Sequence, residues 1–333
     1  MSPAFLMVVV VVVIALLFDF VNGFHDAANA IATVVVSKTL TPLQAVMLAG
    51  FANFVGYFTF GTAVAKMIGK GVVHIEQVTL PLILATLIGA IIWNIITWLL
   101  AIPTSSSHAL IGGLVGSGIA SAGLKVVIWK GVLNIFLFIF IAPLVGLTGA
   151  LIFTLIIMRA FRKIHPHKAK NVFKKLQLVS ATFYSIGHGT NDAQKTMGVI
   201  ALALYSAGIN SSFQIDKWVV LSCYFAIAIG TTFGGWRIVK TMGTSITRIR
   251  SMEGFCAETA AACVLIGTQH FGIPVSTTHV ISGAIMGVGT VEHAKSVRWI
   301  TARKILWAWI ITIPMAAFFS FMIYKTFSSF LPK

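Results

Sequence analysis

Long runs of apolar residues alternate with short polar segments along almost the whole chain. Most of these runs approach or exceed the roughly 20 residues with which a helix crosses the hydrocarbon core of a bilayer. Lipid offers no partners to backbone N–H and C=O groups, so such runs form helices, which satisfy those groups internally. We therefore predict an all-α polytopic membrane protein with apolar runs at 3–21, 43–65, 80–101, 131–158, 176–187 with 196–207, 217–236, 255–272 and 305–324.

Two motifs occur twice, in the same order. Residues 102–108 (IPTSSSH) return as residues 273–279 (IPVSTTH), and residues 23–27 (GFHDA) return in related form as residues 189–193 (GTNDA). Because two different motifs recur together, the duplication indicates two structural repeats. The glycines that follow the Ser/Thr motif recur as well, Gly112 and Gly116 as Gly283 and Gly287.

Each half is expected to hold a long helix broken at its Asp motif, a full span, a re-entrant hairpin with the Ser/Thr motif and a final span. Such a half crosses the membrane an odd number of times, so the second half enters upside down as an inverted-topology repeat. The predicted units are a first inverted repeat at 1–158, a basic cytoplasmic linker at 159–175 and a second inverted repeat at 176–333.

The charge of the chain supports this topology. The formal net charge of +16 would suggest a nucleic-acid partner in a soluble protein, but here the basic residues lie in loops beside apolar runs. No nucleic-acid partner is expected. With the linker inside, sixteen of the 24 Lys and Arg residues fall inside and seven outside, while Lys195 lies within a membrane segment. The positive-inside rule thus predicts that both termini lie outside.

Several of the eight acids fall where hydrocarbon is expected. A charged group at the bilayer centre costs at least about 2.5 kcal/mol, so the matched pair Asp26 and Asp192 indicates a function rather than helix–helix hydrogen bonding alone. Glycine beside polar residues suggests an unwound turn, whose carbonyl oxygens would join carboxylates and Asn side chains as ligands for Na⁺ or a proton-linked site. The other acids in membrane segments are Asp19, Glu253 and Glu258.

The Ser/Thr motifs offer the complementary chemistry. A proline followed by hydroxyl residues is typical of a helix start, where side-chain hydroxyls and free backbone N–H groups converge. Two such ends brought face to face by inversion would suit a tetrahedral oxyanion; the alternative is simple capping or bridging between helices. Lys195 needs a counter-ion, which is either Asp192 or the substrate.

These motifs resemble the inorganic phosphate transporter (PiT) family over nearly the whole chain, and in particular its bacterial low-affinity members. The segments are residues 23–30 (GFHDAANA), residues 188–195 (HGTNDAQK) and the paired Ser/Thr motifs. The resemblance implies secondary transport of phosphate with a cation, not an enzyme. The Phe24-His25 pair before Asp26 is similar to members associated with proton-coupled uptake of phosphate or a neutral metal-phosphate complex, which favours H⁺ over Na⁺.

The resemblance also implies a role for individual residues. Phosphate contacts are Ser105, Ser106, Ser107, Ser276, Thr277 and Thr278. Gln194 and Lys195 are placed with this set, although contact with the cation is open for both. The cation-coupling set is Asn22, His25, Asp26, Asn29, Asn191 and Asp192, with Na⁺ at Asp26, Asn29, Asn191 and Asp192 if it is used. Independently of the resemblance, His108 and His279 are candidates for direct ligands or a proton relay, with core histidines as the alternative, and Glu258 is a further relay candidate.

Two other classes of transport stay open at this point. A symporter of sulfate or another oxyanion is one alternative, because hydroxyls and helix ends distinguish tetrahedral anions only weakly, and an anion channel is the second. No cofactor is expected apart from co-transported H⁺ or Na⁺. The expected partners are inorganic phosphate, the coupling cation and the lipid bilayer of a bacterial plasma (inner) membrane, and family analogy adds a homodimer.

Overall fold

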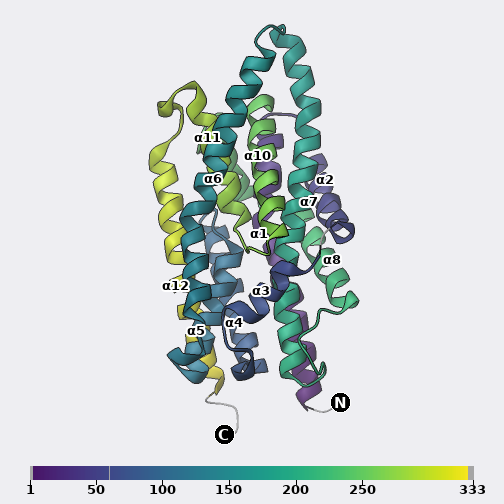
Figure 1. Ribbon diagram of the computed structural model, residues 1–333, viewed down its shortest axis with the longest axis vertical. Helices are drawn as coiled ribbons and strands as arrows, with labels where there is room; N and C mark the ends of the chain where they lie inside the picture. Colours follow the sequence, from purple (N-terminus) through teal and green to yellow (C-terminus); the bar gives the residue numbers. More distant parts are fainter. Residues whose placement is uncertain (1–2, 60, 329–333) are drawn as a thin grey trace.

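The computed structural model describes residues 3–59 and 61–328, which hold twelve α-helices and four short 3-10 helices (Figure 1). Four helices, α1, α4, α6 and α12, are long and apolar enough to cross a membrane, and the bent pair α8 and α9 passes the same test together. Large apolar side chains are exposed on α6, among them Leu133, Leu137 and Ile152. Such a surface is stable against lipid, so the chain is an integral membrane protein of the all-α class.

The described residues hold six α-helices on either side of the α6–α7 turn, and the helices of the two sets follow one another with similar lengths. The first half comprises α1 (Pro3–Val36), α2 (Pro42–Val55), η1 (Gly56–Phe58), α3 (Ala63–Gly71), η2 (Ile75–Gln77), α4 (Leu80–Leu99), α5 (Ser106–Ala122), η3 (Leu124–Val126) and α6 (Trp129–Phe161). The second half comprises α7 (Pro166–Ser206), α8 (Lys217–Phe233), α9 (Trp236–Thr244), α10 (Ser251–His270), α11 (Thr277–Glu292), η4 (Ala294–Ser296) and α12 (Trp299–Ser328).

The long helices of the two halves run in opposite directions. In Figure 1, α1 and α6 run toward the α6–α7 turn and α7 and α12 run away from it, so α1 begins and α12 ends at the opposite end of the molecule. This arrangement agrees with inverted repeats, although the symmetry and the boundaries at 158 and 176 stay predictions. Most of the predicted linker 159–175 is helical, because α6 continues to Phe161 and α7 begins at Pro166.

The predicted breaks at the two Asp motifs are wrong. Both α1 and α7 continue without interruption through these motifs. The glycines serve close packing instead: a side chain on Gly23 would collide with the backbone carbonyl of Ile227 in α8, and one on Gly189 would collide with Asn53 in α2. Among the described residues, one sharp bend lies between α8 and α9, which meet at 71°.

The two predicted hairpins are present, and their second helices start where the Ser/Thr motifs indicate. Ser105 caps α5 by accepting a hydrogen bond from the backbone N–H of His108 at 3.3 Å, and Ser276 caps α11 in the same way with His279 at 3.3 Å. We call residues 100–107 and 271–278 the first and second hairpin tips. Helix α5 packs against α12 and α11 packs against α6, and residues 103–107 and 274–278 of the two tips are buried inside the protein.

Candidate functional site

A stripe of buried polar side chains follows one face of α1. Its members are three or four positions apart, the spacing that places side chains on one face of a helix. The stripe consists of Asp19, Asn22, Asp26, Asn29 and Thr33, all at most 2% exposed. Helix α7 carries a matching set, His188, Asn191, Asp192 and Lys195, which is equally buried.

The α1 stripe holds the first hairpin tip through Ser106. The Ser106 hydroxyl lies 2.6 Å from Asn22 Oδ1 and 2.9 Å from Asp26 Oδ2. The other carboxylate oxygen of Asp26 lies 2.6 Å from His25 Nδ1, and His25 Nε2 lies 3.1 Å from the Thr97 hydroxyl. Both oxygens of Asp26 are therefore engaged, although its helix is not unwound.

The second tip contacts both long helices. Asn29 Nδ2 donates to the Thr278 hydroxyl at 2.9 Å, and the Thr277 hydroxyl donates to Asp192 Oδ2 at 3.2 Å. Residues of α1 thus reach both tips. The packing brings the predicted hydroxyl residues and the predicted cation-coupling residues into one buried cluster.

Lys195 lies where α7 meets both tips. Its ammonium donates to Ser107 Oγ of the first tip, to Asp192 Oδ1 at 2.5 Å and to the carbonyl oxygen of Val275 in the second tip at 3.2 Å. The side chain is 1% exposed. Asp192 is therefore the counter-ion that this buried lysine requires.

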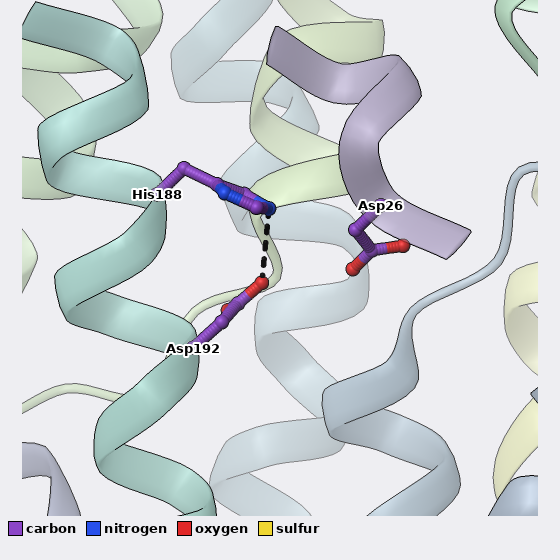
Figure 2. Close-up of side chains that lie close together, drawn as sticks. All are labelled: Asp26, His188 and Asp192. Atoms are coloured by element: carbon purple, nitrogen blue, oxygen red, sulfur yellow. Dashed lines mark ion pairs between the residues drawn. The ribbon is translucent and has the colours of Figure 1, made fainter. Parts of the chain in front are cut away.

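Asp26, His188 and Asp192 form a compact group (Figure 2). One ligand atom from each lies within 4.8 Å of the others, and all three side chains are buried. His188 Nε2 is 3.3 Å from Asp192 Oδ2. Two carboxylates and an imidazole have the chemistry to hold a cation. His188 is not among the predicted site residues, although it corresponds to Asn22 in the repeated motif and could have been identified in that way.

Several buried polar groups beside the tips have no hydrogen-bond partner among the described residues. They include the amide of Asn191, Nδ1 of His108 and both ring nitrogens of His279. The two histidine rings lie 4.8 Å apart, and His279 stacks on Trp309 at 4.0 Å. Because unpartnered buried polar groups are costly, these atoms are candidates for contacts with a ligand.

Two predicted residues lie apart from the tips. Gln194 Oε1 accepts from the backbone N–H groups of Val64 at 2.9 Å and Ala65 at 3.4 Å, so this side chain anchors the start of α3. Glu258 accepts from Thr33 and Ser180, both at 2.5 Å, and has no hydrogen bond to His108 or His279. The three residues of the predicted proton relay therefore do not form one hydrogen-bonded chain.

Glu258 instead belongs to a polar chain that leads from α1 to the linker end of the molecule. Gln177 Nε2 donates to Glu258 at 3.1 Å, and its Oε1 accepts from Ser37 at 2.8 Å and Thr39 at 2.6 Å. Ser37 also lines a cavity of about 550 Å³ at that end. The basic residues that line this cavity are Lys38, Lys170, Arg248 and Arg250.

Comparison with known proteins decides which family has this arrangement. The model of the phosphate transporter family matches residues 22–320. The chain belongs to this family. A probable low-affinity inorganic phosphate transporter of Rhizobium meliloti is 50% identical over 96% of both chains, and one of Bacillus subtilis is 43% identical over 95% of this chain and 96% of the relative.

A solved structure shows the same fold. It is described as the sodium-dependent phosphate transporter, has a TM-score of 0.87 and 25% identity, and the match covers 98% of this chain and 100% of that one. The predicted PiT family is thus confirmed. Members of this phosphate transporter family are transporters, so the prediction that the chain is not an enzyme is confirmed too.

Proposed function

We propose that this phosphate transporter family member is a secondary active symporter that carries inorganic phosphate into the cell together with a cation. The observation that carries the proposal is the contact between the two hairpin tips and the buried carboxylates. Ser106 of the first tip bonds to Asp26, and Thr277 of the second tip bonds to Asp192. The hydroxyls that would donate to an anion are therefore hydrogen-bonded to the carboxylates that would bind a cation.

This sharing offers a coupling mechanism. An anion beside two carboxylates is repelled, and the Ser106 and Thr277 hydroxyls are occupied while the carboxylates accept from them. A cation that cancels the net negative charge of this cluster would reduce the repulsion, and one bound at Asp26 would free the Ser106 hydroxyl to donate to phosphate. Cation binding would then precede phosphate binding, and loaded tips would allow the two halves to rock to the other side.

The membrane potential makes a coupled cation useful. Moving phosphate inward against about 100 mV costs about 2.3 kcal/mol per negative charge. We favour H⁺ as the coupling ion, because the imidazole of His25 lies 2.6 Å from Asp26. Na⁺ is the alternative, supported by the structural neighbour described as sodium-dependent. The substrate is free phosphate or a neutral metal-phosphate complex, and the Asp26, His188 and Asp192 group is where the metal ion of such a complex would bind.

We also propose the bacterial inner membrane as the location, with the α6–α7 turn in the cytoplasm, both termini outside and a homodimer as the assembly. Bacterial relatives of nearly the same length support the location, and the basic linker end supports the orientation. Phosphate is favoured over sulfate because the family is one of phosphate transporters. A channel would need no buried acid pair at the tips.

Uptake of ³²P-phosphate into proteoliposomes tests the proposal. We expect concentrative uptake driven by an imposed H⁺ gradient, or by a Na⁺ gradient if Na⁺ is the coupling ion, with little competition from sulfate. Ser106→Ala should reduce uptake at least ~10-fold through loss of a donor to bound phosphate, and Asp26→Asn should abolish the dependence on the cation.

Ser222→Ala is the matched control, because that side chain is half-buried on α8 and donates to the Trp218 carbonyl oxygen within its own helix. It should transport like the wild type. Dissipative uptake under every gradient, or unchanged cation dependence in Asp26→Asn, would contradict symport at this site. Equal competition by sulfate would make the protein a general oxyanion symporter.

A further inference from the structure

The contacts at the tips repeat between the halves, with one difference in charge. Asp26 bonds to Ser106 as Asp192 bonds to Thr277, and these residues correspond in the repeated motifs. Asn29 and Lys195 also correspond, each three positions after its aspartate. Asn29 donates to Thr278 of the second tip, and Lys195 donates to Ser107 at the corresponding place of the first tip. A neutral amide in one half is thus replaced by an ammonium in the other.

The surroundings of this ammonium are those of a cation site. An ammonium has three N–H donors, and all three have oxygen acceptors here: the Asp192 carboxylate, the Ser107 hydroxyl and the Val275 carbonyl. Carboxylate, hydroxyl and carbonyl oxygens are also the ligands that hard metal cations use in proteins. The ligands come from α7 and from both tips, so whatever occupies this place joins the three elements.

We propose that the Lys195 ammonium is a tethered cation that permanently fills one of two corresponding cation sites. The transporter would then need an exchangeable cation only on the Asp26 side. With the imidazoles counted as neutral, Asp26, Asp192 and Lys195 carry one net negative charge, which one further monovalent cation cancels. The inference rests on the proposed symport and adds the number of exchangeable cations and the residue that sets it.

The same geometry argues against Lys195 as a direct phosphate ligand. Its three donors are already used, so a bond to phosphate would require it to release Asp192, Ser107 or Val275. Release of Asp192 would leave a carboxylate unpaired in a buried place, which is strongly unfavourable. The role of Lys195 is therefore to hold the tips and neutralise Asp192 while other donors bind the anion.

The test replaces Lys195 by the residue found at the corresponding place of α1. Equilibrium binding of ²²Na⁺ is measured on the purified full-length wild type, on Lys195→Asn and on the double variant Asp192→Asn/Lys195→Asn, with size-exclusion chromatography to verify folding. We expect Lys195→Asn to bind one more Na⁺ per chain than the wild type. The double variant, which removes the carboxylate together with the ammonium, should lose that extra ion.

If Lys195→Asn does not fold, the wild type still tests the inference, because more than one bound Na⁺ per chain at saturation would overturn it. Two ions per wild-type chain, or no extra ion in a folded Lys195→Asn protein, would overturn the inference. A raised phosphate KM without any change in Na⁺ binding would make Lys195 a phosphate ligand, also against the inference. Failure of the symport proposal is separate, because it shows as absent concentrative uptake by the wild type.

Discussion

Asp26 and Asp192 stand at corresponding places in α1 and α7, but different groups surround them. Asp26 divides its oxygens between His25 and the Ser106 hydroxyl, whereas Asp192 holds the ammonium of Lys195. The two carboxylates are therefore chemically unequal in spite of the repeat. An exchangeable cation is expected to act on the Asp26 side, where no lysine or arginine among the described residues pairs with the carboxylate.

A residue in the first hairpin turn allows a test of local strain. Ala101 has a φ of 57°, and Gly272 has a φ of 66° at the corresponding place of the second hairpin. This conformation costs a residue with a Cβ about 1–2 kcal/mol and costs glycine little. We expect Ala101→Gly to stabilise the protein by about 0.5–1 kcal/mol, since the greater chain entropy of glycine offsets part of the gain. Gly272→Ala should destabilise it.

Thermal unfolding followed by tryptophan fluorescence in detergent measures both changes. The melting temperature should rise for Ala101→Gly and fall for Gly272→Ala. Shifts of the same sign in the two variants would contradict the assignment of strain to the turn.

The hairpin helices depend on close backbone contact with the long helices that flank them. Gly116 of α5 lies against the backbone of Ala317 in α12, and Gly287 of α11 lies against the backbone of Leu147 in α6. Helices in lipid associate through such small residues, because lipid provides no hydrophobic driving force between them. The repeated glycines therefore position the tips, although they lie three turns or so from the Ser/Thr motifs.

Substitution of one of these glycines should displace a hairpin. We expect Gly116→Leu to destabilise the protein by about 1–3 kcal/mol, the usual cost of overpacking, and to reduce phosphate uptake because α5 carries the first tip. Gly267→Leu in α10 is the matched control, since Gly267 is exposed and no neighbouring atom of the described residues lies within 4 Å of an added Cβ there. Uptake and melting temperature are measured for both variants. Equal melting temperatures for Gly116→Leu and the control would refute the packing role.

The whole protein closes the site from both ends in this structure. Every residue of the tips that contacts Asp26, Asp192 or Lys195 is at most 6% exposed. A basic cavity lies at the linker end, and a second cavity of about 520 Å³, lined in part by Lys70, His74 and Glu76, lies between the ends of α3 and α7. The two cavities thus lie toward opposite ends of the molecule, on either side of the buried tips.

The orientation in the membrane is testable with single cysteines. The background is Cys263→Ala, because Cys263 is exposed whereas Cys223 and Cys256 are buried. Lys163 lies in the exposed α6–α7 turn, and Lys125 lies in exposed η3 near the opposite end. We expect a membrane-impermeant thiol reagent to label Lys125→Cys in intact cells and to label Lys163→Cys only after permeabilisation. The reverse pattern would place the linker outside and contradict the positive-inside prediction.

Local patterns were enough for the class of protein, the order of its elements and the starts of α5 and α11. Apolar side chains favour lipid over water wherever they stand in the chain, so long apolar runs predict membrane helices. A Ser or Thr cap bonds to a backbone N–H only a few residues away, so the helix start is also predictable from the local sequence. These features need no knowledge of the rest of the fold. The resemblance of the motifs likewise identified the family before any contact was known.

Packing between distant segments decided the remainder. Whether Gly23 breaks α1 or admits Ile227 of α8 depends on a helix some 200 residues away. Gln194 and Lys195 are adjacent, yet consecutive positions on a helix point roughly 100° apart, so one anchors α3 and the other joins the tips. His188 lies beside Asp26 because α7 packs against α1, which the local motif does not reveal. The direction of a side chain and its contacts with distant segments depend on how the helices pack together. A local motif therefore does not predict them.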